Sequence, residues 1–282
     1  MNQLTTERRA AVIAALVEGN SLRGTSRITG VARMTVEKLL REVGAACAAY
    51  HDANVRNVKA QRIQCDEIWA FCYAKNRAIK DDPSIRERNK DAGDVWTWTA
   101  IDADTKLIVS WLVADRNLPS AIAFCQDVRE RLANRVQLTT DAYRLYLTAV
   151  DKAFGVDVDY AQLHKIYASE TTGRYSPPKI VGVKAASATG SPDPRHISTS
   201  YVERQNLTMR MHMRRFARLT NAFSKKLEMH AASVALHFMH YNFCRIHQTL
   251  RVTPAMESGL TDRVWEISDL VALVESKQAL SA

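Results

Sequence analysis

Three stretches between residues 61 and 114 have the composition of β-strands, and their order constrains the fold more than any other feature. The chain reads QRIQCDEIWAFCY at 61–73, VWTWTAIDA at 95–103 and KLIVSWLVA at 106–114. The first is β-prone with alternating polarity, and a turn at Asp104 and Thr105 joins the second to the third. These residues predict three strands in succession.

A change of period after the third strand predicts helices that alternate with further strands. Residues 119–135 and 143–154 have helical spacing, whereas VQLTTDA at 136–142 and VDVDYAQLHKIY at 156–167 read as strands. The order is strand, strand, strand, helix, strand, helix, strand. We therefore expect an α/β fold in which helices pack on a mixed sheet.

The first 50 residues predict a helix-turn-helix domain. A helix at 5–19, a short helix at 21–29, a turn at Gly30 and a third helix have the order of that motif. The start of the third helix would then enter the major groove, and the alternative is a plain three-helix bundle without DNA binding. The residues expected to face DNA are Arg33, Thr35 and Lys38.

Two polar stretches interrupt the regular pattern. Residues 75–94 are charged and predict a solvated loop, and residues 175–196 are rich in Pro, Gly and Ser and predict irregular structure. The second belongs to an inserted loop expected near 169–197. The expected domains are 1–55 for the helix-turn-helix and 60–282 for the α/β domain.

The charge balance favours a polyanionic partner. Net charge is +9 with a pI near 9.4, so nucleic acid is the first candidate and an anionic membrane surface the second. The five cysteines form no CxxC pair, which makes a structural zinc site a poor expectation and reduced thiols a better one. No apolar run has the length that spans a bilayer, and we expect a cytoplasmic, nucleoid-associated protein.

Glu203 stands at the head of a segment that otherwise carries only positive charge. Seven Lys and Arg residues follow between Arg204 and Lys226, and the next acid is Glu228. A helix this basic fits an anion, and a divalent metal ion between carboxylate and anion would remove their repulsion. The same segment predicts a helix that begins near Thr199.

Two further acids occupy positions that a surface role explains poorly. Asp66 lies within the apolar strand CDEIWAF, where a charge needs a partner, and Asp141 ends the strand VQLTTDA. Ligands bind at the carboxyl ends of strands in α/β sheets. Strand alternation turns the neighbouring Glu67 to the opposite face, so we expect no role for it in the site. The alternative is three unrelated surface or capping acids.

These segments resemble the insertion-sequence transposases of the IS-one family, which belong to the DDE group. The likeness is carried by CDEIWAF, GDVWTWTAIDADTKLIVSWLV, LTTDAYRLYL and STSYVERQNLTMRMHMRRFARLTNAFSKKLEMH, and it extends from about Ile63 to Val271. The resemblance implies a ribonuclease-H-like, retroviral-integrase type of catalytic core. Two departures are the lack of a cysteine zinc ribbon and the long interval between Asp141 and Glu203.

The resemblance also implies a catalytic centre and its partners. Asp66, Asp141 and Glu203 would be the DDE residues and would hold two Mg²⁺ ions, or Mn²⁺ in their place. The enzyme would cleave transposon ends and join the 3′-OH to target DNA, working as a homodimer or higher homo-oligomer on double-stranded DNA. The residues expected to contact that DNA after Glu203 are Arg204, Asn206, Arg210, Arg214, Arg215, Arg218, Lys225 and Lys226.

Two other functions fit the same residues. A domesticated or inactive helix-turn-helix protein would bind DNA without catalysis, and a ribonuclease-H-like nuclease such as a junction resolvase would cleave without strand transfer. An intact acid triad argues against the first, and a domain for recognising DNA ends argues against the second. The roles of Lys165, Lys179 and Lys184 stay open at this point.

Overall fold

The structure is a computed structural model that describes residues 4–168, 179–217 and 220–279. The chain forms two compact units, each made of more than one stretch of the sequence. The helix-rich unit comprises Met1–Arg56, Ile68–Thr97 and Gln205–Ala282, and the sheet unit comprises Asn57–Glu67 and Trp98–Arg204. The domain boundaries expected from the sequence stay a prediction.

A six-stranded mixed sheet has the strand order β3-β2-β1-β4-β5-β6. β4 pairs in parallel with β1 and with β5, whereas β6 pairs antiparallel with β5. The mixed α/β fold predicted from the sequence is thereby confirmed. The strands are β1 (Arg62–Cys72), β2 (Gly93–Asp102), β3 (Ile108–Ala114), β4 (Gln137–Asp141), β5 (Asp159–Tyr167) and β6 (Ile180–Thr189).

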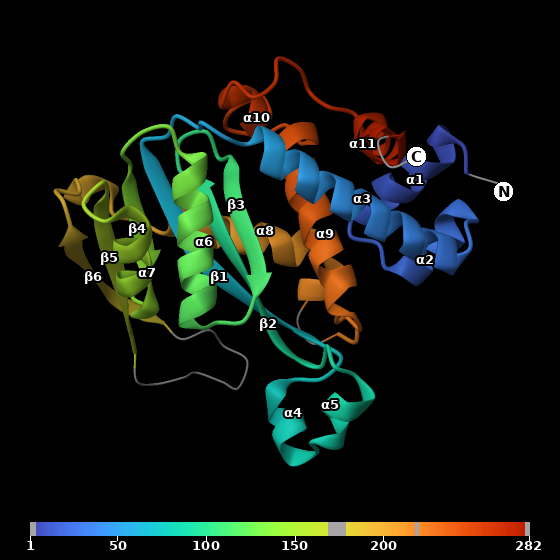
Figure 1. Cartoon of the computed structure of the whole chain (residues 1–282), viewed down its shortest axis with the longest axis horizontal. Helices are drawn as coiled ribbons and strands as arrows, with labels where there is room; N and C mark the ends of the chain where they lie inside the picture. Colours follow the sequence, from blue (N-terminus) through green and yellow to red (C-terminus); the bar gives the residue numbers. More distant parts are fainter. Residues whose placement is uncertain (1–3, 169–178, 218–219, 280–282) are drawn as a thin grey trace. The chain divides into compact units, whose positions relative to one another are not determined.

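Two helices of the sheet unit, α6 (Leu118–Arg131) and α7 (Leu145–Phe154), pack together on one face of the sheet (Figure 1). Asn117 caps α6 by accepting the Ser120 N–H at 2.9 Å. Apart from two short helices between β1 and β2, the predicted order of strands and helices is confirmed from β1 through β5. This order places β4 beside the first half of β1 in the middle of the sheet.

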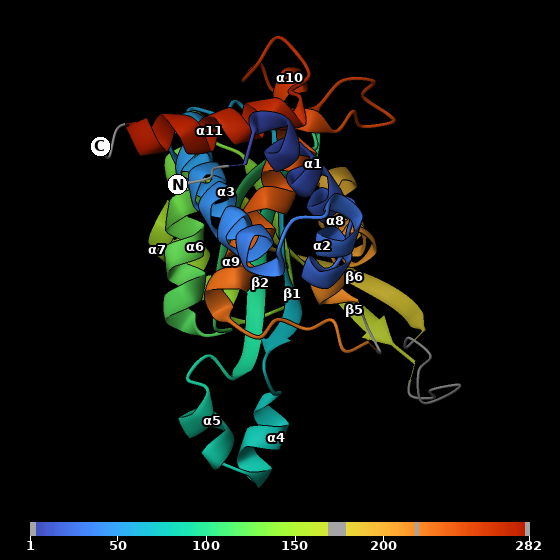
Figure 2. The same cartoon turned by 90° about the vertical axis from the view of Figure 1, so that its right-hand side faces the viewer.

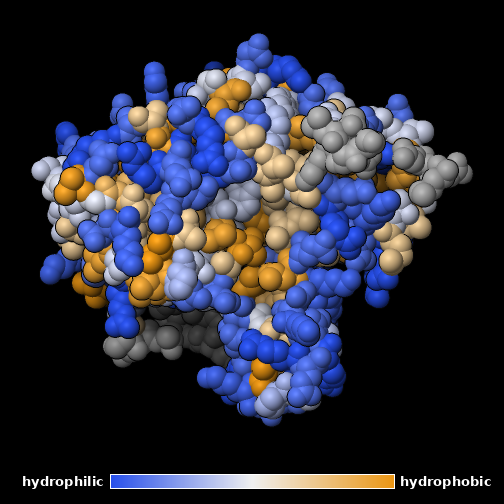
Figure 3. All heavy atoms as spheres, viewed as in Figure 1, coloured by the Kyte–Doolittle hydropathy of each residue, from blue (hydrophilic) through white to orange (hydrophobic). Residues whose placement is uncertain are grey.

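Strand β6 and two short helices correct the sequence interpretation. Residues 180–189 lie within the predicted irregular stretch but form β6, because hydrogen bonds to β5 order a segment rich in Ala, Ser and Gly. The predicted loop 75–94 contains α4 (Asn76–Asp81) and α5 (Ser84–Arg88). Figure 3 shows mainly hydrophilic side chains over these two helices, which agrees with the solvated position expected for them. The rest of the predicted insertion, 169–178, lies outside the described residues.

Three helices at the N-terminus match the predicted ranges: α1 (Thr6–Val17), α2 (Leu22–Thr29) and α3 (Arg33–Asn54). Ser21 caps α2 by accepting the Gly24 N–H at 3.0 Å, and Gly30 ends it with a φ of 66°, a conformation that glycine adopts without strain.

Helices from the C-terminal third complete the packing of the helix-rich unit. Gly44 on α3 meets α9 (Leu227–Met239) so closely that a Cβ atom would lie 2.5 Å from the Cα of Ala232. α11 (Ile267–Ala279) lies against α1 and α3 (Figure 2). The predicted first three helices therefore share a core with the C-terminal helices.

The predicted basic helix is shorter than expected. α8 (Ser200–His212) ends before Met213, and Arg214–Phe216 form a 3-10 turn. The remaining described elements are a 3-10 turn at Pro194–His196, a π-helical turn at His240–Cys244 and α10 (Pro254–Glu257).

The cysteines and the hydropathy of the helices fit the expectations from composition. All five cysteines are free, and four of them are buried. In the part of the chain that the structure describes, no helix combines the length and apolar character needed to cross a membrane.

Candidate active site

Parallel pairing of β1 with β4 brings two of the predicted acids together in the sheet unit. Cys65 pairs with Thr140, so the next residues along the two strands are Asp66 and Asp141. Carboxylate oxygens of Asp66, Glu67 and Asp141 all lie within 4.8 Å of one another. Oxygen atoms at this spacing suit a hard divalent cation.

The structure corrects the side-chain position expected for Glu67. Strand alternation predicts that it points away from Asp66, yet its carboxylate belongs to the same cluster. β4 ends at Asp141, so no β4 residue lies beside residue 67. The Glu67 side chain is 1% exposed, which sets it apart from the solvated acids of the loops.

Arg116 connects two carboxylates of the cluster. Its Nε lies 3.4 Å from Glu67 Oε1, and its Nη2 lies 4.0 Å from Asp141 Oδ2. The guanidinium also stacks on Tyr143, 3.8 Å from the ring centroid, and the Tyr143 N–H donates to Asp141 Oδ1 at 3.0 Å. This cation therefore positions the acids and partly offsets their repulsion.

Burial and mutual repulsion raise the pKa of two acids. Burial is the larger cause for Asp66 and the Asp141 charge the next, and together they raise the pKa of Asp66 to about 7. Burial and the Asp141 charge raise the pKa of Glu67 to about 8, although Arg116 opposes this. Carboxylates pressed together in this way favour either a shared proton or a bound cation.

The first turn of α8 is attached to β1 two residues before Asp66. Gln64 Oε1 accepts the N–H of Tyr201 at 2.8 Å and of Val202 at 3.2 Å, which satisfies two free donors at the helix start. Glu203 follows directly, and its negative charge contributes to the raised pKa of Asp66. Gln64 thus directs Glu203 to the side of the sheet where Asp66 lies.

Two neighbours hold the Glu203 carboxylate. Lys165 on β5 forms an ion pair with Oε1, and the Thr199 hydroxyl donates to the same oxygen. The Glu203 side chain is 39% exposed, against 18% for Lys165. Lys165, whose role the sequence leaves open, is thereby a partner of the third acid. No local sequence signal marks this pair, because Lys165 on β5 and Glu203 on α8 are 38 residues apart in sequence.

The predicted DNA-binding residues differ in exposure. Arg33 and Lys38 are exposed at the start of α3 and Thr35 is half-buried, while Asn206 is 6% exposed, which suits support of α8 better than contact with DNA. Arg218 lies outside the described residues. The half-buried cations are Arg210 and Arg215, and the exposed ones are Arg204, Arg214, Lys225 and Lys226.

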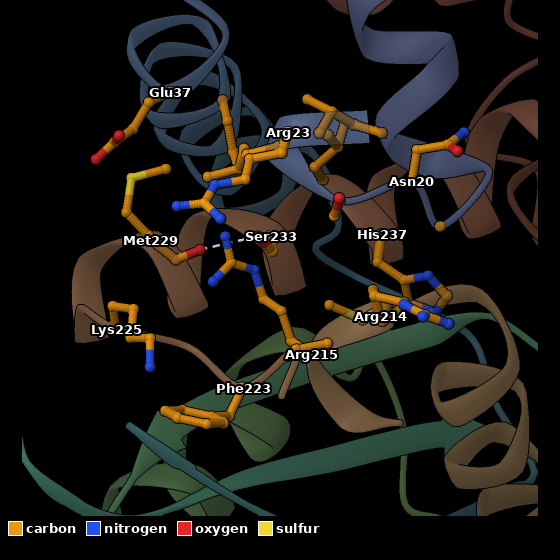
Figure 4. A pocket seen from close by; sticks show the side chains of 18 of the residues that line it. Asn20, Arg23, Glu37, Arg214, Arg215, Phe223, Lys225, Met229, Ser233 and His237 are labelled. Atoms are coloured by element: carbon orange, nitrogen blue, oxygen red, sulfur yellow. Dashed lines mark hydrogen bonds between the residues drawn. The ribbon is translucent and has the colours of Figure 1, made fainter. Parts of the chain in front are cut away.

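A basic pocket of about 850 Å³ lies within the helix-rich unit (Figure 4). Arg23 and Arg215 come from facing walls in this view. Among the described residues that line the pocket, Glu37 is the one acid. The sequence analysis missed Arg23 because its neighbours in the pocket come from distant segments. The lining cations are Arg23, Arg33, Arg214, Arg215, Lys225 and Lys226.

Comparison with known families bears on the part of the chain that carries Glu203. Residues 194–244 match the family model described as IS1 transposase. The chain resembles the IS1 transposases. This confirms the resemblance predicted from the sequence, and it suggests an enzyme that acts on DNA by cleavage and strand transfer. A comparison with curated proteins gives no match.

Proposed function

We propose that this protein is a DDE transposase that cleaves the ends of an insertion sequence and joins the freed 3′-OH to target DNA. The observation that carries the proposal is the convergence of Asp66 and Asp141 on neighbouring parallel strands, with carboxylate oxygens within 4.8 Å. Glu203 would be the third acid of the triad. It lies within the region that matches the IS1 transposases.

The topology of the sheet supports a ribonuclease-H-like core. The strand order β3-β2-β1-β4-β5 has β1 at its centre with β4 and β5 parallel to each other, and α6 and α7 cover one face. The first acid is on the central strand, the second ends the fourth strand and the third is on a later helix. We infer that fold from this order together with the family match.

The residues present fit divalent metal ions. Asp66 and Asp141 offer only oxygen, they repel each other, and Oε2 of the buried Glu67 makes no hydrogen bond among the described residues. Asp66, Asp141 and Glu203 would hold two Mg²⁺ ions, with Mn²⁺ as a substitute. When bound, such ions activate a water molecule and stabilise a leaving 3′ oxygen in phosphodiester chemistry.

The protein groups around the acids orient them. Arg116 fixes Glu67 and Asp141 relative to each other, and its remaining charge suits a phosphate that approaches the cluster. Gln64 fixes the first turn of α8, and Lys165 holds Glu203 in one position. Because Glu67, Asp141 and Glu203 each have such a partner, these acids are positioned before DNA binds.

The helix-rich unit would supply DNA binding. We infer that α2 and α3 form a helix-turn-helix with Arg33, Thr35 and Lys38 toward the transposon end. The cations of the basic pocket would bind phosphates without sequence preference. We propose that the protein works on the two terminal repeats and the target DNA as a homodimer or higher homo-oligomer.

A cleavage and joining assay tests the proposal. The purified protein is incubated with a labelled duplex that carries the terminal repeat, a target plasmid and Mg²⁺, and the products are separated on denaturing gels. We expect nicked ends and joined products, both lost in EDTA and in Asp141→Asn. Asp151→Asn on the exposed surface of α7 is the matched control and should keep activity.

The outcomes also separate the alternatives. Cleavage without joined products would favour the nuclease. Specific binding without cleavage, unchanged by Mg²⁺ or Mn²⁺, would contradict catalysis and favour a helix-turn-helix binding protein.

A further inference from the structure

Aromatic side chains occupy the exposed face of the C-terminal end of β1 and of the residue that follows it. Trp69 and Tyr73 are 36% and 38% exposed and Phe71 is half-buried, while the residues between them, Ala70 and Cys72, are buried. Strand alternation explains this pattern, because residues two apart share a face. Large rings on a strand face that water reaches carry a cost in free energy, so they call for a binding role.

A fourth ring extends the group from a distant part of the chain. Phe223 stacks on Phe71 with centroids 4.7 Å apart and planes at 28°, and Trp69 lies 5.7 Å from Phe71 with planes at 33°. The backbone fixes this arrangement, since the Tyr73 N–H donates to Ser224 O at 2.7 Å. We call Trp69, Phe71, Tyr73 and Phe223 the aromatic row.

Two lysines lie over the faces of these rings. Lys75 Nζ is 5.3 Å from the Trp69 centroid and 5.4 Å from that of Phe71. Lys225 Nζ is 3.5 Å from the Phe223 centroid and 6.0 Å from that of Tyr73. Both lysines are exposed. The row therefore presents π-faces and positive charge on one surface, and all six residues belong to the helix-rich unit.

We propose that the aromatic row binds single-stranded nucleic acid. Unpaired bases have exposed π-faces that stack on aromatic side chains, and a phosphate chain complements lysines beside the rings. When bases stack on the rings, Lys75 and Lys225 would move off the ring faces and pair with the phosphates of the bound strand. A base pair in a duplex keeps its faces covered by its neighbours, so a duplex would not use the rings.

Charge complementarity selects this occupant over a protein partner. From Arg204 to Lys226 the chain carries seven cations and no acid, and Phe223 and Lys225 also line the basic pocket. A strand that stacks on Phe223 would find further cations for its phosphates there. The proposal goes beyond transposition and does not use the carboxylates of the sheet unit.

Binding of labelled oligonucleotides tests the proposal. Fluorescence anisotropy in EDTA compares an oligothymidine of about twelve nucleotides with a duplex of the same length. We expect Trp69→Ala and Phe223→Ala to weaken binding of the single strand about tenfold each, and Trp69→Ala to leave duplex binding within about twofold. Trp69→Phe keeps a stacking ring and should retain most of the affinity.

Matched controls make the result specific. Tyr167→Ala removes a ring of the sheet unit that is 51% exposed and should change neither affinity. Lys75→Gln leaves the fold intact and should lower the salt dependence for the single strand alone, whereas Lys80→Gln on α4 should not. Thermal unfolding confirms that each variant is folded.

Two results would overturn the proposal. In the first, folded Trp69→Ala and Lys75→Gln both bind oligothymidine as the wild type does. In the second, each variant loses single-strand and duplex affinity equally. Because the assay contains no divalent metal, a failure of cleavage activity would not alter its result, and loss of the proposed transposase function would be seen separately.

Discussion

The sheet unit and the helix-rich unit concentrate charge in opposite ways. The sheet unit gathers acids where β4 ends beside the middle of β1, and burial and repulsion there raise the pKa of Asp66 to about 7 and of Glu67 to about 8. The helix-rich unit spreads cations over several segments, and most of them are exposed. The function of the acid cluster depends on the positions of its oxygen atoms, whereas that of the cations depends mainly on their total charge.

This contrast follows from what each charge has to bind. Metal chemistry needs oxygen atoms at fixed distances, so the sheet holds the acids and Arg116 and Gln64 orient their surroundings. Phosphate binding without sequence preference tolerates movement, so long side chains on turns and helix ends suffice. We therefore expect substitutions in the two units to affect different measurements.

The largest effect should come from the acids of the proposed triad. Asp66→Asn, Asp141→Asn and Glu203→Gln keep the shape of each side chain but remove a charged metal ligand. We expect the rate of cleavage and joining to fall about a thousandfold or more, with DNA affinity within about twofold of wild type. Single-turnover gel assays and anisotropy measure the two quantities.

Full activity in any one of these variants would remove that residue from the triad. A parallel loss of DNA affinity would break the comparison, because the acids would then also support the DNA-binding surface. Asp151→Asn again serves as the control for a charge lost elsewhere in the sheet unit.

Glu67→Gln should have a smaller effect that reports on support rather than ligation. Glu67 is buried beside Asp66 and Asp141 and is held by Arg116, so its loss disturbs the site without removing a predicted ligand. We expect metal affinity about 10–100-fold weaker, measured by titration calorimetry with Mn²⁺, and unchanged DNA affinity. An effect as large as that of Asp66→Asn would instead make Glu67 a metal ligand.

The outcome for Glu67 shows where sequence reasoning stops. Asp66 and Asp141 were placed together through the resemblance to a ribonuclease-H-like core, in which their two strands are neighbours. Glu67 was assigned to the opposite face because side chains alternate along a strand, but β4 ends at Asp141 and no β4 residue lies beside residue 67. Lys165 gave no signal because its partner lies on α8, and only the fold joins them.

The elements missed in the sequence analysis lack a local sequence signal. Half of the residues of β6 are Gly, Ala or Ser, and the order of the strand comes from hydrogen bonds to β5. α4 and α5 are short helices in a charged segment without an apolar stripe. By contrast, α1, α2 and α3 were predicted well because caps and turns mark their ends locally.

In the basic pocket, single substitutions should have modest and similar effects. Arg23→Gln and Arg214→Gln each remove one exposed cation that lines the pocket. We expect about fivefold weaker duplex binding at low salt and a salt dependence lower by about one counterion. Mn²⁺ affinity should not change. Arg8→Gln on the exposed side of α1 is the control, and an equal loss there would mean that the pocket has no special part in binding.

The smallest expected effect concerns stability at acid pH in the helix-rich unit. Burial is the main cause that lowers the pKa of His230 and of His237 to about 3, and Arg215 adds to this at His230. An unfolded histidine has a pKa of about 6.5, so below that pH the unfolded chain binds more protons than the folded one. The stability is therefore complete above about pH 6.5 and is lost as the pH falls toward 3.

The acids of the sheet unit respond to pH with the opposite sign. A raised pKa gives stability that is complete below the unfolded value of about 4 and is lost as the pH rises through about 7 to 8. Lowering the pH should thus reduce the stability of the helix-rich unit and increase the stability of the sheet unit. A substitution in the helix-rich unit can separate the two responses, because it leaves the carboxylates unchanged.

His237→Leu should flatten the acid side of the stability profile. Leucine cannot bind a proton, so the change in melting temperature between pH 7 and 5 should shrink by about 4–8 °C, as expected for about 2 kcal/mol of proton linkage. Thermal unfolding followed by circular dichroism measures it. The comparison uses the slope of stability with pH, because the absolute stability also changes when a buried ring is replaced.

His196→Leu removes an exposed histidine of the sheet unit and should leave the slope as it is. If His237→Leu keeps the wild-type slope, buried imidazoles do not set the acid limit of the helix-rich unit, and the opposite pH responses of the two units fail as an explanation.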